Sequence, residues 1–298
     1  MNQLDEIIST LNTNGVIKLS NIFNPQQINI LSSIYTQSWN EIKSQWPSKW
    51  YTIQFNNTSK HKYDYFMGVK LYDCKKQSFY KDTPILDMGL NRYDFTYNLD
   101  TIKHQSPLPT ILTDIMNRLL GPEWEYYYGG LPILPDTLDN PKQHGFWHRD
   151  AYSLFNDELL DISLPPFYYT ILIPLQQLDE KQDALHADGI ASVNGGGTEF
   201  ILGSHKQSFT TGDIPITDKP ITNEYELINY LEELTIQHPE KSFSPNLNSG
   251  DVVIFSGYTI HRGLCPKISN QSRDMIYIVC KKTWYNDEPS ENYIETAI

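Results

Sequence analysis

Apolar residues recur at helical spacing in four stretches of the chain, each bounded by a helix start or stop signal. Asn24–Pro25 opens one stretch with a capping side chain followed by proline at the first helical position, and Asn14–Gly15 closes another. The pattern predicts helices over residues 4–14, 25–42, 109–120 and 224–234. Helices with one apolar face of this kind are expected to brace a β-sheet.

Short runs of β-branched and aromatic residues, separated by turn signals, predict a series of β-strands. These runs lie at residues 16–19, 124–128, 167–173, 198–202, 250–255 and 275–279. Residues 43–105 show no sustained period, although Tyr63 and Tyr65, and again Tyr93 and Phe95, alternate as strand residues do. Many short strands with turns between them favour a β-sandwich or a jelly roll.

Length and composition are those of a globular chain with room for a full core. The sequence has 298 residues, 39% of them hydrophobic, and lacks an apolar run long enough to cross a membrane. No repeat or composition shift marks a domain boundary. The sequence therefore predicts one domain over residues 1–298, with N-terminal helical support over about 1–120 and a β core over about 124–285.

Net charge, cysteine content and the N-terminal residues indicate the cell compartment and the class of partner. Residues 1–6 lack a basic segment followed by an apolar one, and three scattered cysteines suit neither a disulfide framework nor a zinc cluster. These features predict a cytoplasmic protein. A formal net charge of −13 argues against nucleic acid and anionic membranes as partners, since both demand basic patches. A small-molecule substrate is expected, and the oligomeric state stays open.

Candidate metal chemistry centres on His148 and Asp150. Their spacing of two residues places both side chains on one face of a β-strand and sends Arg149 to the other face. His261 follows the apolar run that begins at Gly250 and could join them from far along the chain. Two histidines and one carboxylate, with the remaining coordination positions open, are diagnostic of non-haem Fe(II) oxygenases.

Arg273 is the candidate anchor for a keto-acid cosubstrate. It stands at the entrance to the 275–279 run, and period two puts it on the same face as Met275, Tyr277 and Val279. A guanidinium near the metal could hold the distal carboxylate of 2-oxoglutarate by two parallel hydrogen bonds. Alternatively, Arg273 pairs with a strand neighbour such as Asp274. Thr170 could share the carboxylate or be an ordinary strand threonine, and Tyr128 is a weaker candidate for that contact.

At these residues the chain resembles the phytanoyl-CoA dioxygenase family of Fe(II)/2-oxoglutarate-dependent oxygenases. The resemblance rests on an ordered set of motifs: residues 147–150, Asn194–Gly195, 202–206, 250–255, 261–263 and Arg273. It implies a double-stranded β-helix, a jelly-roll barrel open at one end, with helices packed outside. It also implies that His148, Asp150 and His261 bind Fe(II) and that Arg273 binds 2-oxoglutarate.

The implied reaction consumes O2 and 2-oxoglutarate, releases succinate and CO2, and oxidises an unactivated C–H bond of a small organic substrate. A carboxylate at Asp150 favours hydroxylation over halogenation, because halogenases of this chemistry leave that coordination position vacant. Desaturation or oxidative ring closure remains an alternative. So do a non-catalytic jelly-roll binding protein and a jelly-roll metalloenzyme that uses no keto acid.

Other histidines give weaker candidates for the metal site. His186 and Asp188 repeat the His-x-Asp spacing, but they lie in an acidic segment without a strand pattern. His205 belongs to a Gly-Ser-His turn for which the resemblance implies a structural or near-site role, and His144 is expected in a loop. Trp147 and Arg149 are expected to face away from the metal, Trp147 into the core. Arg149 either forms a surface ion pair or lines a substrate pocket at the edge of the strand. Leu202 stands where the family has proline, and residues 175–194 and 206–249 are longer than usual, which leaves the substrate open.

Overall fold

The fold is described from a computed structural model, which places residues 2–55, 76–89, 91–134, 145, 147–151, 165–175, 197–206, 224–264, 272–285 and 291–294. The helices are α1 (Gln3–Asn14), α2 (Pro25–Ser44), α4 (Ile102–Gln105), α5 (Thr110–Leu120) and α7 (Glu224–Gln237). Single 3-10 turns occur at η3 (Leu99–Thr101), η4 (Ser204–Lys206) and η5 (Pro239–Lys241). The strands are β1 (Val16–Leu19), β2 (Tyr51–Phe55), β3 (Lys76–Tyr80), β4 (Thr83–Gly89), β5 (Arg92–Phe95), β6 (Trp124–Ile133), β7 (Tyr168–Pro174), β8 (Thr198–Ile201), β9 (Ser242–Phe243), β10 (Val252–Ser256), β11 (His261–Gly263), β12 (Arg273–Lys282) and β13 (Glu291–Ile294).

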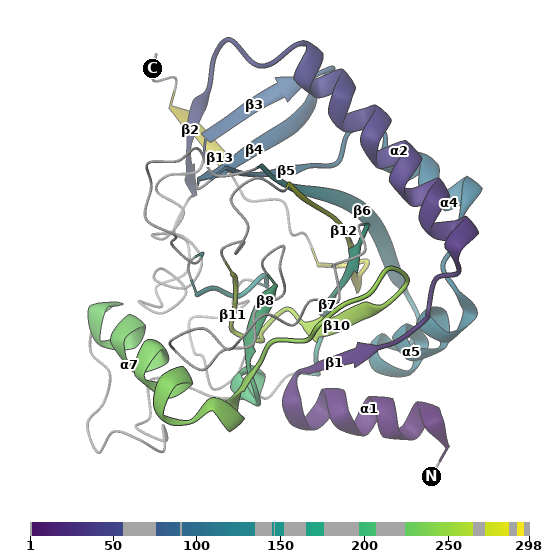
Figure 1. Ribbon diagram of the computed structural model, residues 1–298, viewed down its shortest axis with the longest axis vertical. Helices are drawn as coiled ribbons and strands as arrows, with labels where there is room; N and C mark the ends of the chain where they lie inside the picture. The colour runs from purple at the N-terminus through teal and green to yellow at the C-terminus, as the bar shows by residue number, and fades with distance from the viewer. Residues whose placement is uncertain are drawn as a thin grey trace.

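Two antiparallel sheets form the architecture. The large sheet has ten strands in the order β1-β10-β7-β12-β6-β5-β4-β3-β2-β13, and the small sheet has the order β11-β8-β9. The large sheet curves strongly, and the small sheet lies opposite its concave side (Figure 1). Each strand pairs antiparallel with its neighbours, which is the arrangement of a jelly roll.

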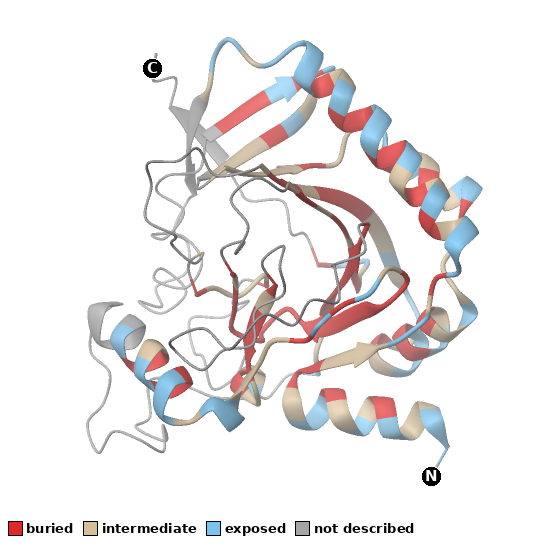
Figure 2. Cartoon of the chain, viewed as in Figure 1, coloured by how far each residue is buried: buried red, intermediate tan, exposed pale blue. Residues whose placement is uncertain are grey.

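Helices α1, α2, α4 and α5 cover the convex side of the large sheet and share one core with it. Figure 2 shows buried residues along the sides of α1 and α2 that face the strands. The largest apolar cluster joins the helices to β6, β7, β10 and β12, with fully buried members such as Leu31, Ile115, Ile171 and Ile278. A second cluster, with Phe200 and Phe255 at its centre, fills the space between the two sheets. The sheet is therefore packed on both faces, which explains its continuous apolar strands.

Most of the predicted elements are present, with one large addition. The helix predicted from Pro109 begins at Thr110, and the strand predicted over 124–128 continues to Ile133 as β6. The addition is the set β2 to β5, which extends the large sheet from the segment that showed no sustained period. Tyr93 and Phe95, whose alternation is that of strand residues, lie on β5 as expected. The expectation of helical support over about residues 1–120 was therefore incomplete, because that segment also supplies β1 to β5. Tyr63 and Tyr65 lie outside the described residues.

The junction between α1 and β1 depends on a glycine. Gly15 caps α1 in the left-handed conformation, at φ +78°, and its N–H donates to the Leu11 carbonyl. A β-carbon at Gly15 would lie 2.5 Å from both His205 Nδ1 and Thr259 Oγ1. The carbonyl of Gly15 also accepts a hydrogen bond from the Thr259 hydroxyl, at 2.9 Å. The glycine thus lets the first helix reach the turn that leads to His261.

Gly15→Ala is expected to lower the free energy of unfolding by more than the roughly 1–2 kcal/mol that a left-handed alanine costs, because steric overlap adds to the backbone strain. Gly203→Ala is the control, since Gly203 also has a positive φ (+76°) but its nearest atom beyond its neighbours, Thr13 O, is 3.8 Å from the added β-carbon. Urea unfolding followed by circular dichroism measures both. Equal losses in the two variants would contradict a steric role for the contacts at Gly15.

Candidate metal centre

Three potential metal ligands from separate parts of the chain converge at the edge of the small sheet. His148, Asp150 and His261 each present one donor atom, and all three atoms lie within 4.8 Å of one another. His148 pairs with His261 through an isolated antiparallel bridge, in which each N–H donates to the other residue's carbonyl at 2.9 Å. Asp150 lies in a bend, where its N–H donates to the Gly257 carbonyl at 3.0 Å. Hence a single bridge and a bend bring the donors together, rather than the regular strand that the spacing suggested.

The geometry of the three side chains suits a divalent metal. Asp150 Oδ1 lies 3.4 Å from His261 Nε2 and 3.8 Å from His148 Nε2. His261 Nδ1 lies 3.0 Å from the Thr259 carbonyl, to which it can donate, and this tautomer leaves the Nε2 lone pair directed at the cluster. Two imidazole nitrogens and one carboxylate oxygen, with no thiolate among them, are the donor set expected for Fe(II). The donor set and its geometry therefore fit the implied metal.

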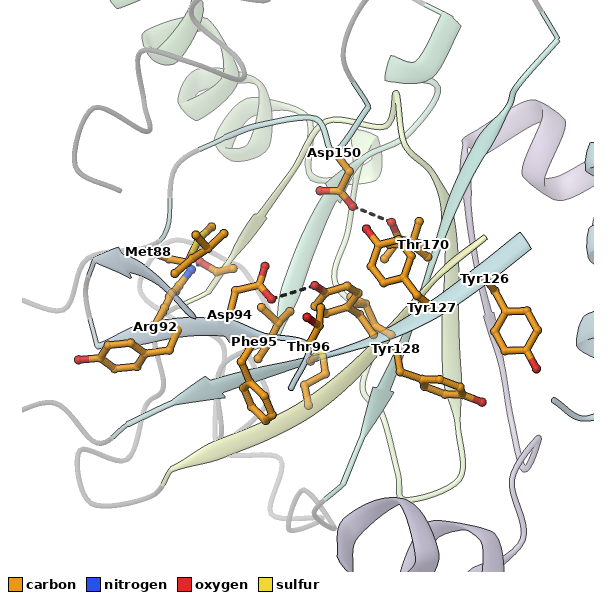
Figure 3. A pocket seen from close by; sticks show the side chains of 18 of the residues that line it. Met88, Arg92, Asp94, Phe95, Thr96, Tyr126, Tyr127, Tyr128, Asp150 and Thr170 are labelled. Carbon is orange, nitrogen blue, oxygen red and sulfur yellow. Dashed lines mark hydrogen bonds between the residues drawn. The ribbon is translucent and has the colours of Figure 1, made fainter. Parts of the chain in front are cut away.

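Thr170 holds the carboxylate of Asp150 in place. Its hydroxyl, on β7, donates to Asp150 Oδ2 at 2.7 Å, and the residue is 3% exposed (Figure 3). The bond occupies the oxygen that is not shared with the histidines and so orients Oδ1 toward them. A contact between Thr170 and 2-oxoglutarate stays a prediction. In the structure the Thr170 hydroxyl donates its hydrogen bond to Asp150.

Aromatic packing fixes the imidazole of His261. Its ring lies 4.6 Å from the ring centroid of Phe255 and 5.7 Å from that of Phe200, and the side chain is 7% exposed. The side chains of His148 and Asp150 are more open, at 20% and 23%. One side of the cluster is therefore sealed by the core between the sheets, and the other side faces a cavity.

That cavity, about 850 Å³ in volume, lies between the cluster and the outer strands of the large sheet. His148, Asp150 and His261 line it together with Arg273 and residues of β4, β5 and β6. Figure 3 shows Asp150 and Thr170 across the cavity from Arg92 and Asp94. Cavities of this size accept small organic molecules.

Arg273 is buried in the cavity wall, as the first residue of β12. It is 5% exposed, and its Nη1 donates to the Gly197 carbonyl at 2.8 Å. Burial, and to a lesser degree the positive charge of Arg92, lower the pKa of Arg273 to about 9. The guanidinium is therefore still charged at neutral pH, in surroundings where an anion would be strongly attracted.

Arg92 is a second cavity arginine that the sequence reasoning missed. Its Nη2 donates to the carbonyls of Gly263 and Leu264, at 2.9 and 3.2 Å. A β-carbon at Gly145 or Gly263 would lie 2.2 Å from its Nη1, so the guanidinium needs both glycines beside it. Arg92 lies in the segment without a hydrophobic period, and no local signal marked it.

Tyr277 and Asp94 form a second polar contact in the cavity wall. The hydroxyl of Tyr277 donates to Asp94 Oδ1 at 2.8 Å (Figure 3), which links β12 to β5 across β6. The ring lies over Gly129 of β6, where a β-carbon would fall 1.9 Å from it. Burial, followed by the charge of Asp94, raises the pKa of Tyr277 well above its usual value. The tyrosine is therefore a neutral donor that holds Asp94 on the cavity side.

Tyr128 packs on the helix side of β6. Its ring belongs to the core between the large sheet and the helices, whereas Tyr127, on the opposite face of β6, packs near Tyr277 at a ring-centroid distance of 6.4 Å. Period two explains the difference, because neighbouring residues on a strand point to opposite sides. Tyr128 nevertheless lies among the residues that line the cavity, and its contact with 2-oxoglutarate stays a prediction.

His205 lies away from the cluster. Its Nε2 is 3.3 Å from the Asn12 carbonyl, and burial lowers the pKa of its imidazole to about 4. It packs at Gly15 and has the structural role expected of the turn. His144, His186 and Asp188 lie outside the described residues. Trp147 is buried, as predicted, and Arg149 lies at the cavity, where its Nη2 is 3.5 Å from the Ser204 carbonyl.

Comparison with known proteins adds evidence on the fold. No protein-family model matches the chain, and no curated protein sequence matches it. The non-heme α-ketoglutarate-dependent carbocyclase SnoK from nogalamycin biosynthesis superposes with a TM-score of 0.54 at 12% identity, over 95% of this chain and 84% of SnoK. HygX from Streptomyces hygroscopicus, with nickel and 2-oxoglutarate bound, gives 0.53 at 12% identity, over 96% and 89%. AviO1 from Streptomyces viridochromogenes Tue57 gives 0.52 at 14% identity, over 96% and 98%.

At these identities the likeness concerns the fold. The prediction of a mainly β, double-stranded β-helix core with flanking helices is confirmed. None of the described helices is long and apolar enough to cross a membrane.

Thr170→Val is expected to weaken binding of a divalent metal by about 10-fold or more, because the ligand carboxylate loses the donor that orients it. Thr170→Ser keeps the hydroxyl and should bind the metal nearly as well as the wild type. Titration calorimetry with Co(II) under anaerobic conditions measures the dissociation constants. Equal affinity of the valine and serine variants would contradict an orienting role for the Thr170 hydroxyl.

Proposed function

We propose that the protein is an Fe(II)/2-oxoglutarate-dependent oxygenase, a single domain over residues 1–298, that hydroxylates an unactivated C–H bond of a small organic molecule. In this proposal His148, Asp150 and His261 hold the iron and Arg273 holds the distal carboxylate of 2-oxoglutarate. The observation that carries it is the convergence of the three donors and one buried guanidinium on the same cavity. The resemblance to the phytanoyl-CoA dioxygenase family supports it.

Iron with 2-oxoglutarate and O2 would supply the oxidising power for C–H cleavage, with release of succinate and CO2. The protein's own residues would bind the metal, orient its ligands and shield the site from water. His261 is held by its Nδ1 contact with the Thr259 carbonyl and by aromatic packing, and Asp150 is held by Thr170. Phe200 and Phe255 keep water from the sealed side of the cluster. This chemistry requires rigidly held metal ligands and a site wall that excludes water.

Arg273 and Arg92, two of the arginines that line the cavity, favour a dianionic cosubstrate. Arg273 and Arg92 lie close enough that the charge of Arg92 lowers the pKa of Arg273. Repulsion between like charges in a buried site is relieved when an anion binds beside them. 2-Oxoglutarate carries two carboxylates, of which one can chelate a metal and the other can pair with a guanidinium.

The reaction type has one alternative that uses the same cofactors. Oxidative ring closure or desaturation would need the same iron site and differ only in where the substrate is held. SnoK, which shares this fold, is an α-ketoglutarate-dependent carbocyclase, and this supports ring closure as the alternative. A carboxylate at Asp150 supports hydroxylation over halogenation, and the complete donor set argues against a non-catalytic jelly roll.

His261→Ala is expected to abolish the visible metal-to-ligand charge-transfer band that the wild type should show when Fe(II) and 2-oxoglutarate are added without oxygen. The control is His238→Ala, because the His238 side chain is 42% exposed and lies outside the cluster. Absorption difference spectra measure the band. A wild type without the band, or a His261 variant that keeps it, would overturn the proposed iron site.

Arg273→Leu is expected to raise the dissociation constant of 2-oxoglutarate about 10- to 150-fold, since a hydrogen bond to a charged group contributes roughly 1.5–3 kcal/mol. Binding of the metal alone should be unchanged. Arg118→Leu, which removes an exposed arginine of α5, is the control for charge. Titration of the charge-transfer band with 2-oxoglutarate gives the constants, and unchanged affinity in Arg273→Leu would point to a metalloenzyme without a keto-acid cosubstrate.

A further inference from the structure

A buried ionic network lies behind the metal centre, on the side away from the cavity, and it centres on Arg262. Arg262 follows His261 on β11 and pairs with Glu199 of β8 across the small sheet. Its Nε donates to Glu199 Oε2 at 2.9 Å, in a contact where the two side chains are 3% and 0% exposed. This pair gives the buried guanidinium a counter-charge, and it anchors β11 to β8.

Glu232 of α7 joins this network from outside the two sheets. Its Oε1 accepts a hydrogen bond from Arg262 Nη1 at 2.5 Å and another from Trp147 Nε1 at 3.2 Å. The guanidinium of Arg262 also stacks over the Trp147 ring, at 4.2 Å from its centroid. Trp147 immediately precedes His148, and Arg262 immediately follows His261. One carboxylate therefore contacts the neighbours of both histidines.

The segment that carries His148 is held to β11 by few backbone bonds among the described residues. These are the His148–His261 bridge and the Gly145 N–H, which donates to the Gly263 carbonyl at 2.7 Å, while the N–H groups of Asp150 and Ala151 both donate to Gly257. Bonds at scattered points hold a segment less firmly than a continuous ladder does. The Trp147–Glu232–Arg262 contacts add a side-chain attachment next to both histidines.

Removing the carboxylate of Glu199 and removing that of Glu232 would have different effects on the charge balance of Arg262. Glu199 is fully buried, and its removal would leave a buried arginine without its main counter-charge. Glu232 is 42% exposed, so a neutral amide there leaves Arg262 paired with Glu199. What Glu232 adds is the connection between the two histidine segments and α7, which stands beside the small sheet (Figure 1).

We propose that Glu232 is a positioning residue for the metal centre: it clamps the segments of His148 and His261 together and makes their spacing depend on the docking of α7. This role rests on the proposed function, since the clamp acts through the metal ligands. Glu232 touches neither the cavity nor the cluster. Its effect reaches the site only through Trp147 and Arg262.

Glu232→Gln is expected to speed metal loss about 10-fold and to alter the visible spectrum of the Co(II)-substituted protein, which reports on ligand geometry. Contacts behind metal ligands have effects of about this size. Glu233→Gln is the matched control, because it makes the same charge change at an exposed neighbouring position of α7. Trp147→Phe removes the N–H donor to Glu232 and leaves a smaller ring beside Arg262, and it should shift the Co(II) spectrum in the same direction.

Metal loss is followed by transfer of Co(II) to excess chelator, and thermal unfolding of the metal-free proteins is recorded alongside. Faster loss and a changed spectrum in Glu232→Gln, with the control unchanged, support the clamp. A lower unfolding temperature with a wild-type spectrum and rate would make Glu232 merely structural and overturn it. Equal behaviour of wild type and Glu232→Gln overturns the clamp alone, whereas a wild type that binds no metal overturns the proposed function and the clamp together.

Discussion

The pair of backbone hydrogen bonds between His148 and His261 is the contact on which the rest of the site depends. It sets the register of a segment that is not part of a regular strand against β11. Asp150 lies two residues further on, and its N–H bond to Gly257 turns the carboxylate back toward the imidazoles. The donor geometry thus follows from a few backbone bonds, and side chains such as Thr170 and Glu232 secure it from the two sides.

Local charge in the cavity runs against the charge of the whole molecule. The chain carries a formal net charge of −13, yet Arg92 and Arg273 approach each other in its cavity wall. Desolvation strengthens their attraction for an anion, because few solvent dipoles remain to screen it. A negative net charge of the whole chain is therefore fully compatible with an anionic cosubstrate in this cavity.

β12 runs along the cavity and points every second side chain, from Arg273 to Val279, into it. Arg273 lies at its start, beside Gly197 and the small sheet, and Tyr277 reaches across Gly129 to Asp94 on β5. The outer strands of the large sheet are thereby tied to the strand that carries the arginine. One wall of the cavity, formed by β4 and β5, is built from the segment whose sequence pattern was least informative.

The sequence alone determined the elements with strong periods and the residues at fixed spacing along them. His148 with Asp150, His261 after its strand, and Arg273 on the face of Tyr277 could be predicted because alternation and short spacing are local properties. Arg92, Asp94 and Glu232 could not be predicted, since their importance comes from pairing with residues far away in the chain. Strands β2 to β4 likewise lack a period, and the alternation of Tyr93 and Phe95 is the one local mark of β5, so these strands take their place from their neighbours in the sheet. Only the tertiary structure could decide these contacts, because hydrogen bonds and ion pairs between distant segments leave no spacing in the sequence.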